Sequence, residues 1–493
     1  MNLALKIVRE FFDKVEQDRI RYCLWKGSQH LGESLSGEGD LDCLVDQSQA
    51  ARFESILGEL GYKRFISQTW ASYPGIEDWI GFDRDTGKLV HLHLYYQMIL
   101  GTRFVKEYHL PWEDLILETA IKNSDFEVFV ADPNIELILF GIQMGLNNKL
   151  SQFGSFLPGQ RSFTKGMNKK YSFLVNQINE ASLTEFSQYL FGEEDGELFA
   201  SILLQGDFHP VNTLVNQSLS QYRRYDRMGV MAVFASRALG YLGARAKRKL
   251  RVNSHTGKRM ENQGSIIAFI GSDGSGKTTL SNELQQWLAW KIDANKIYLG
   301  SGDGSVDVSV KLLKSLSSKS QTEKINSGSK EANQVNKNFR RKTSHLKEIG
   351  SCLLDLSITN QRHRKLRGAN QDRTRGSILI IDRYPQNQFV GIYDGPRVAR
   401  KNTGSRIRKY FSGLEEKKYQ EMASIAPDIV FKLHVPLDVA LQRKPDHNVE
   451  NISQKAEITS QLKFADSRVI DVDASQSVIE VLNSVKQAVW ESI

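Results

Sequence analysis

Apolar and polar positions follow two different patterns in the two halves of this chain. From Gly264 onward, short β-branched runs such as SIIAFIG alternate with stretches of helical spacing such as TTLSNELQQWLAWKI. Strands that alternate with helices are typical of a parallel sheet covered by helices. The pattern therefore predicts an α/β domain over 264–493.

The first half begins with a mixed pattern and then becomes helical. YCLWKGS and DLDCLV predict short strands, QAARFESILGELGYKRF predicts a helix, and WIGFDRDTGKLVHLHLYY predicts a hairpin around a polar turn. Residues 1–131 are therefore expected to form an α+β domain. Over 132–235 the apolar spacing is mostly helical, as in NIELILFGIQMGLNNKL, and predicts a helical section.

A basic segment over 236–263 separates these parts and is expected to be a linker. It contains no acid between 236 and 260, and its cations include Arg245, Lys247, Arg248, Lys249, Arg251, Lys258 and Arg259. A solvated linker is one interpretation. Because apolar residues alternate with the cations, peripheral contact with an anionic membrane is the other.

Composition bounds the class of protein. The chain has 493 residues, 40% of them hydrophobic and 25% charged, which favours a folded protein of several domains. Its formal net charge of +8 favours acidic partners such as nucleotides or anionic membranes. Nucleic acid is not an expected partner, because no reader motif accompanies the charge. A Ser/Lys/Asn-rich stretch over 314–345 predicts a mobile insertion.

Targeting signals are not evident. The start, MNLALKIVREFFDKVEQDR, reads as an amphipathic helix that carries acids and not as a signal peptide. The three cysteines form no C-x-x-C pair, so neither a disulfide framework nor a zinc ribbon is expected. A cytoplasmic protein is predicted, with association at the inner membrane face through the basic segment left open.

The most specific motif is G-x-x-x-x-G-K-T, from Gly271 to Thr278, between a predicted strand and a predicted helix. In that context the backbone N–H groups and the positive helix end surround a phosphate chain. Lys277 is expected to reach the β/γ oxygens, and the Thr278 hydroxyl to hold Mg²⁺, so ATP and Mg²⁺ are the predicted cofactors. The predicted donor site comprises Gly271, Ser272, Asp273, Gly274, Ser275, Gly276, Lys277, Thr278 and Thr279.

This loop and a second strand resemble thymidylate kinase. That family pairs an acid-containing GxDGxGKTT loop, here GSDGSGKTT, with a strand that ends in Asp-Arg, here Asp382-Arg383. The likeness covers most of 264–493. It implies that Lys277, Arg383 and Arg443 surround the transferred phosphoryl group and that Asp382 holds the metal or its water shell.

The acceptor side is less well defined. By the same resemblance, Arg362 in SITNQRHRKL is the helix arginine that holds the acceptor's phosphate. The segment YPQNQFVGIYDGPRVARK departs from the family, and its Asp394-Gly395-Pro396 turn could present Asp394 to a different acceptor. Asp273, Arg362, Arg383 and Asp394 are the predicted acceptor-side residues. A nucleotide, a sugar or a lipid-linked sugar remain open as acceptors.

A second constellation lies near the start of the chain. Gly27-Ser28 is followed by Asp40-Leu41-Asp42 on a predicted strand, where side chains two apart share a face and can share one cation. This resembles the nucleotidyltransferase superfamily, which implies that the Gly-Ser loop binds nucleotide phosphates and that Asp40 and Asp42 hold Mg²⁺.

That superfamily supplies a third carboxylate from a neighbouring strand. Here the place is taken by His91 and His93, expected on one strand face, and a neutral imidazole does not supply the missing charge. Asp83 and Asp85, in the turn of the hairpin, are weaker substitutes. Either catalysis is altered, with His93 close to the site, or the domain binds nucleotide without turning it over.

Together these motifs predict an ATP- and Mg²⁺-dependent phosphotransferase of the nucleoside monophosphate kinase type, fused to a nucleotidyltransferase-like domain. The expected partners are a nucleotide donor and a nucleotide or sugar-type acceptor, and a homodimer is left open. The fusion is similar to bacterial surface-polysaccharide enzymes. The alternatives are nucleotidyl transfer assisted by the kinase half and a nucleotide-gated regulatory or defence protein.

Overall fold

The chain forms two compact units, Met1–Glu261 and Asn262–Ile493, and each is described separately. The computed structural model describes residues 4–102, 104–148, 165–208, 210–249, 257–300, 332–401 and 405–493. The expected insertion over 314–331 lies outside these ranges.

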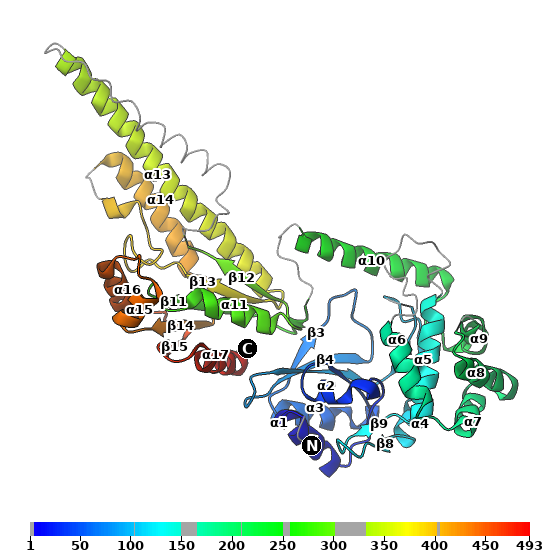
Figure 1. The fold of residues 1–493 in the computed structure, drawn as a ribbon. Helices are drawn as coiled ribbons and strands as arrows, with labels where there is room; N and C mark the ends of the chain where they lie inside the picture. Colours follow the sequence, from blue (N-terminus) through cyan, green and yellow to red (C-terminus); the bar gives the residue numbers. More distant parts are fainter. Residues whose placement is uncertain are drawn as a thin grey trace. The chain divides into compact units, whose positions relative to one another are not determined.

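A mixed sheet forms the centre of the first unit (Figure 1). Its strands, in spatial order, are β10 Arg259–Met260, β3 Lys63–Ile66, β4 Ile76–Phe82, β5 Leu89–Tyr95, β2 Asp40–Val45, β1 Tyr22–Leu24, β9 Phe129–Val130 and β8 Ile121–Lys122. β4 and β5 form the predicted antiparallel hairpin, and β2 pairs with the other edge of β5 in parallel. β5 therefore lies between β2 and β4.

Two helices of the first unit pack together over this sheet. α1 Lys6–Gln17 buries one apolar stripe, and α3 Ala50–Glu59 meets it there. Phe11 of α1 contacts Phe53 of α3 edge-on, with ring centroids 5.1 Å apart. Shorter elements complete this part: α2 Leu31–Leu35, α4 Glu113–Glu118, β6 Met98–Leu100 and β7 Tyr108–Leu110.

Helices follow the sheet, as the apolar spacing over 132–235 indicates. They are α5 Pro133–Asn148, α6 Lys165–Val175, α7 Glu180–Phe191, α8 Glu193–Gln205, α9 Val211–Ser218 and α10 Arg227–Lys249. The apolar helix α5 contacts α6, α7, α8 and α9 and forms a second core with them.

Much of the segment expected as a linker is regular structure. α10 continues to Lys249, and β10 pairs with β3. The inner face of α10 packs on the first unit, where Phe234 lies against Phe104 and Tyr241 against Trp70. The basic segment therefore includes a helix that belongs to the first unit.

The second unit has the parallel sheet that its alternating pattern predicts. Its spatial order is β12 Ala294–Tyr298, β13 Ile378–Asp382, β11 Ile266–Gly271, β14 Ile429–His434 and β15 Arg468–Asp473. All adjacent pairs are parallel. The central strands β11 and β13 are apolar and fully buried, because helices cover both faces of the sheet.

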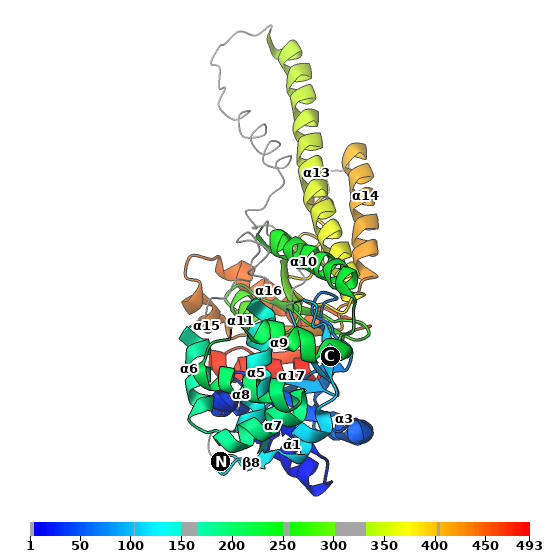
Figure 2. The same cartoon turned by 90° about the vertical axis from the view of Figure 1, so that its right-hand side faces the viewer.

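Helices connect these strands. They are α11 Lys277–Leu288, α13 Ala332–Arg373, α14 Arg406–Ala423, α15 Leu437–Arg443, α16 Val449–Gln461 and α17 Val478–Ser492. α14 packs along the long helix α13 (Figure 2). α13 begins at Ala332, so residues 332–345 of the expected insertion are helical, and their mobility stays a prediction. This stretch contains neither Gly nor Pro, and its Lys, Arg and Gln residues favour a helix.

We expect a fragment covering 262–493 to unfold cooperatively and to bind ATP·Mg²⁺, because the P-loop and the whole parallel sheet lie within the second unit. Urea unfolding followed by circular dichroism, and calorimetric titration with ATP, measure the two properties. The 1–261 fragment is the matched control. A fragment 262–493 that precipitates or ignores ATP, while the full chain binds it, would show that the predicted domain boundary is misplaced.

Candidate active site

The P-loop leaves the carboxyl end of β11 and enters α11 at Lys277. Gly274 has φ +84°, and a Cβ atom there would lie 2.7 Å from the Ala440 carbonyl oxygen. Gly276 has φ +86° and caps α11. Larger residues would strain both positions, so glycine lets the backbone wrap tightly around the loop's centre.

Lys277 is buried inside this loop. Its Nζ donates to the carbonyl oxygens of Gly271 at 2.8 Å and Ser272 at 2.6 Å. Burial, together with the positive charge of Arg383, lowers the pKa of Lys277 to about 8. The ammonium is therefore poorly solvated, and a phosphate oxygen placed here would stabilise it strongly.

Asp382 ends β13 beside the P-loop and is fully buried. Its Oδ2 accepts a hydrogen bond from the Thr278 hydroxyl at 2.8 Å and lies 3.4 Å from Lys296 Nζ. Its Oδ1 is buried and has no hydrogen-bond partner among the described residues. A buried carboxylate oxygen without a donor leaves an acceptor for a cation or a proton.

These oxygens fit Mg²⁺. Mg²⁺ prefers hard oxygen ligands and usually takes one or two protein side chains together with phosphate oxygens and water. The Thr278 hydroxyl and the Asp382 carboxylate supply such ligands side by side. In the described part of the chain, no group of three or more His, Cys, Asp or Glu side chains is arranged as a metal site, so an all-protein cage is not what this geometry offers.

Asp273 is the carboxylate at which several cations meet. Arg383 Nη2 lies 3.2 Å from its Oδ1, and Lys455 of α16 pairs with its Oδ2. Burial raises the pKa of Asp273, but the hydrogen bond and charge of Lys455, with Lys277 and Arg383, outweigh burial and lower it. Asp273 is thus ionised and holds two cations at the pocket.

Arg383 itself is held in an unusual conformation. Its φ is +69°, a left-handed value that is uncommon for a residue with a side chain. Its Nε is buried without a partner among the described residues. An unpaired guanidinium N–H beside a P-loop is a donor for an anionic ligand.

Arg443 also reaches the P-loop. It ends α15, and its Nη1 lies 3.4 Å from the Gly274 carbonyl oxygen and 3.0 Å from that of Ala474, after β15. The side chain is exposed, as is Thr279 on α11. The structure thus brings Lys277, Arg383 and Arg443 to one loop, and their catalytic roles remain proposals.

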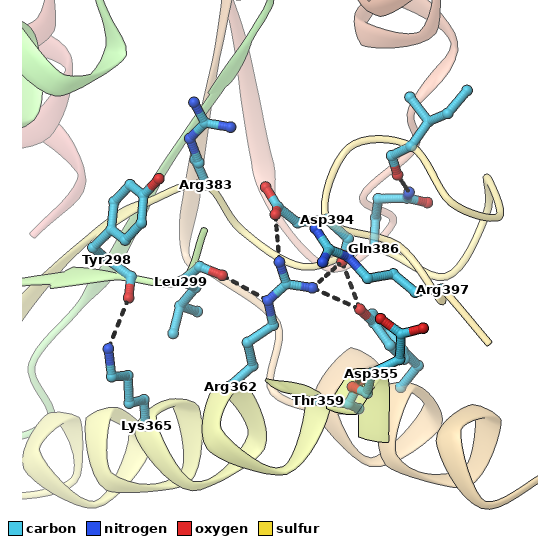
Figure 3. Close-up of polar contacts among 12 residues, drawn as sticks. Tyr298, Leu299, Asp355, Thr359, Arg362, Lys365, Arg383, Gln386, Asp394 and Arg397 are labelled. Atoms are coloured by element: carbon cyan, nitrogen blue, oxygen red, sulfur yellow. Dashed lines mark hydrogen bonds and ion pairs between the residues drawn. The ribbon is translucent and has the colours of Figure 1, made fainter. Parts of the chain in front are cut away.

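Arg362 and Asp394 contact each other, and both are largely buried (Figure 3). Arg362 Nη2 donates to Asp394 Oδ1 at 2.5 Å, and its Nε donates to the Leu299 carbonyl oxygen at 2.7 Å. Its Nη1 donates to the Tyr419 hydroxyl and to the Asp394 carbonyl oxygen. The guanidinium that was expected to hold an acceptor phosphate is therefore satisfied within the protein.

A cavity of about 300 Å³ is lined by residues of the P-loop, by Arg383, by the 391–400 loop and by α16. Its charged lining is predominantly cationic: Lys277, Arg383, Arg397, Arg400 and Lys455, against Asp273 and Asp394. Sequence reasoning missed Lys296, Lys455, Arg397 and Arg400. The two arginines lie in the segment that departs from the family pattern, and that departure was the available signal.

The first unit contains a separate polar network on β2, β4 and β5. In the strand register Asp42 lies opposite His93, and His93 lies opposite Asp78. His91 bridges Asp40 at 2.8 Å and Asp78 at 2.9 Å, and His93 Nδ1 lies 3.2 Å from Asp42. The two histidines do share a face, as predicted.

Asp78 is the third carboxylate that sequence reasoning missed. The suggested substitutes lie elsewhere: Asp83 accepts hydrogen bonds from the Ile7 N–H and from Thr86, and Asp85 pairs with Lys6. The prediction that Asp83 or Asp85 supplies the third carboxylate is therefore wrong, because both side chains make other contacts at the hairpin turn. The alternation of EDWIGF on a strand beside the histidines could have indicated Asp78.

Internal groups occupy the positions where the resemblance places metal and phosphate. Lys26 Nζ lies 2.8 Å from Asp42 Oδ1. The Gly27 N–H and the Ser28 hydroxyl both donate to the buried carboxylate of Glu136, at 3.0 and 2.5 Å. Burial raises the pKa of Asp42, but Lys26 and His93 hold it well below its usual range. The geometry favours a neutralised network over an open Mg²⁺–nucleotide site.

Comparison with known proteins identifies relatives of about half the chain. It is 29% identical over 236 residues to the uncharacterized ATP-binding protein YghS of Escherichia coli K12, a match that covers 46% of this chain and 93% of YghS. It is 25% identical over 250 residues to the uncharacterized ATP-binding protein YghR of the same strain, covering 48% of this chain and 92% of YghR. About half of this chain is homologous to these proteins.

Other comparisons add little. No model of a known protein family matches this sequence. Among solved structures, deoxyadenosine kinase from M. mycoides with bound dATP superposes with a TM-score of 0.26 and 15% identity, covering 45% of this chain and 98% of that one. A superposition of that quality supports no inference about chemistry.

We expect the double change Asp40→Asn with Asp42→Asn to leave the ATP affinity of the full chain, and its Mg²⁺ dependence, within about twofold. The reason is that Lys26 already pairs with Asp42, His91 already contacts Asp40, and Glu136 occupies the Gly-Ser donors. Calorimetric titration with ATP, with and without Mg²⁺, measures this, after circular dichroism has verified the fold. A marked loss of Mg²⁺-dependent affinity would restore the nucleotidyltransferase-like interpretation.

Proposed function

We propose that this protein is an ATP- and Mg²⁺-dependent phosphotransferase whose chemistry resides in the second unit. The main observation in support is that the P-loop residues Lys277 and Thr278 lie with Asp382 and Arg383 at the carboxyl ends of the adjacent parallel strands β11 and β13. Open α/β sheets bind their ligands at such strand ends. The names of YghS and YghR support ATP as the donor.

Phosphoryl transfer needs positioning and positive charge more than covalent chemistry from the protein. Lys277 binds the donor's terminal phosphates, and the unpaired Nε of Arg383 donates to the transferred group. Arg443 closes the P-loop side and adds charge. Thr278 and Asp382 hold Mg²⁺, which supplies further charge neutralisation on the phosphates.

The acceptor is a nucleotide or a sugar-type molecule, and a role in bacterial surface-polysaccharide synthesis rests on the resemblance alone. A nucleotide-gated regulator is the main competing function. Turnover separates the two, because a regulator binds ATP and releases it or hydrolyses it without passing phosphate to an added acceptor. Labelled ATP with a panel of acceptors tests this directly.

We also propose that α10 contacts an anionic membrane. Its outer face exposes Met228 (75%), Met231 (61%) and Leu239 (68%), which recur at helical spacing. The helix leads into the basic residues from Arg245 onward. An apolar helix face that is followed in the sequence by a run of basic residues suits an interfacial helix on acidic lipid. None of the helices in the described chain combines the length and apolarity that crossing a bilayer requires.

Lys277→Ala should lower phosphoryl transfer by on the order of 100-fold or more, since one lost charge at the phosphates removes several kcal/mol of transition-state stabilisation. Initial rates with labelled ATP measure the effect. The exposed Lys463, outside the pocket, provides a Lys→Ala control that should retain activity. Undiminished transfer by correctly folded Lys277→Ala protein would refute the kinase assignment.

Met231→Glu with Leu239→Glu should reduce co-sedimentation with phosphatidylglycerol vesicles by about tenfold. Both new carboxylates disfavour insertion into the apolar layer and are repelled by the anionic headgroups. Phosphatidylcholine vesicles should bind little wild-type protein. Tyr189→Glu, at an exposed apolar position on α7, is the matched control. If the same double change instead abolishes a dimer in light scattering and leaves vesicle binding unaltered, α10 serves self-association and not a membrane.

A further inference from the structure

The loop over 384–401 is a part of the second unit whose sequence departs from the pattern of thymidylate kinase, and several side chains hold it in place. Gln386 donates to the carbonyl oxygens of Phe389 and Ile392, at 2.8 and 2.7 Å. Arg362 and Tyr419 both hold the Asp394 carbonyl oxygen. The loop is therefore positioned by side chains from the helices α13 and α14.

Backbone contacts fix the next residues as well. The fully buried carboxylate of Glu415 on α14 accepts the N–H groups of Arg397 at 3.0 Å and Val398 at 2.8 Å. Since the Arg397 main chain is held, its side chain extends from a defined point into the cavity, toward Asp394 (Figure 3).

Arg400 reaches the same cavity by a different route. Its aliphatic stem crosses Gly391, where a Cβ atom would lie 2.4 Å from Arg400 Cδ. Gly391 also has φ +76°, so glycine is favoured at this position both by conformation and by the approach of the arginine. The absence of a Cβ atom at Gly391 thus leaves room for the Arg400 side chain to cross the loop.

The charges around the cavity separate these two arginines from the others. Asp273 forms ion pairs with Lys455 and Arg383, and Asp394 forms one with Arg362. Within the described residues, neither the Arg397 nor the Arg400 guanidinium has a hydrogen bond or an ion pair. Two guanidinium groups that are directed into one cavity and have no ion-pair partner of their own repel each other unless an anion lies between them.

We propose that Arg397 and Arg400 bind a phosphate group on the acceptor, in place of the helix arginine Arg362. The proposal rests on the phosphotransferase function above and narrows the acceptor to a phosphorylated molecule, such as a nucleoside monophosphate or a sugar phosphate. Guanidinium groups match phosphate oxygens in both charge and geometry. Arg362 acts instead as a positioning residue that holds the Asp394 turn.

The first experiment measures the subsite without requiring transfer. Labelled inorganic phosphate is bound to full-length Lys277→Ala protein, in which the P-loop lysine no longer contributes. Adding Arg397→Gln and Arg400→Gln should weaken phosphate binding by about tenfold or more, because two charged hydrogen-bond donors are lost. Arg375→Gln, an exposed surface arginine on which no cavity contact depends, is the matched control. Equal phosphate affinity in all three proteins would overturn the proposal.

The second experiment uses transfer from ATP to nucleoside monophosphates, sugar phosphates and their unphosphorylated counterparts, with Lys277 intact. We expect only a phosphorylated acceptor to be used, and Arg397→Gln with Arg400→Gln to raise its KM about tenfold while the KM for ATP stays unchanged. The acceptor whose KM rises in the double variant shows whether the substrate is a nucleotide or a sugar phosphate. Efficient transfer to an unphosphorylated acceptor, equal in the double variant, would overturn the subsite. Phosphate binding that depends on both arginines, without transfer to any acceptor, would instead refute the phosphotransferase function alone.

Discussion

The pairing of β11 with β13 is the constraint on which the candidate site depends. β11 ends in the P-loop, and β13 ends in Asp382, which lies opposite Phe269 in the parallel register. That register brings the Asp382 carboxylate to the Thr278 hydroxyl. A shift of the strands by one residue would turn Asp382 to the other face of the sheet and separate the two oxygens. The metal ligands proposed here are therefore set by backbone hydrogen bonds between buried strands.

Charge compensation shapes the rest of the pocket. Asp273 offsets Arg383 and Lys455, and Asp394 offsets Arg362, so acids that belong to the protein determine which cations remain for a ligand. Removing one partner of a buried ion pair costs about 3–5 kcal/mol, which makes such pairs parts of the scaffold. The same rule explains why an arginine in the expected place can have a structural role, while two arginines from an irregular loop line the cavity.

In the first unit, charged groups of the protein compensate each other more completely than in the pocket of the second unit. Its strands bring three carboxylates and two histidines together, but Lys26 and Glu136 stand where a cation and a phosphate would be expected. Hydrogen-bond donors and acceptors that are already satisfied inside a protein gain little from an external ligand, because the ligand must first displace the internal partner. This network is therefore better suited to holding β2, β4 and β5 together than to turnover.

The sequence by itself determined the parallel sheet of the second unit, the P-loop with its strand and helix, the β4–β5 hairpin and the helical section, because these depend on local periodicity and on glycine positions. It also placed Asp382 at a strand end. It did not reveal that Arg362 pairs with Asp394, that Asp78 joins the histidines, or that Glu136 reaches Gly27 across more than a hundred residues. Those contacts join residues distant in the chain, so only the tertiary structure decided them. Local patterns predict on which helix, strand or loop a charged residue lies. Packing decides which opposite charge its side chain contacts and whether it remains available to a ligand.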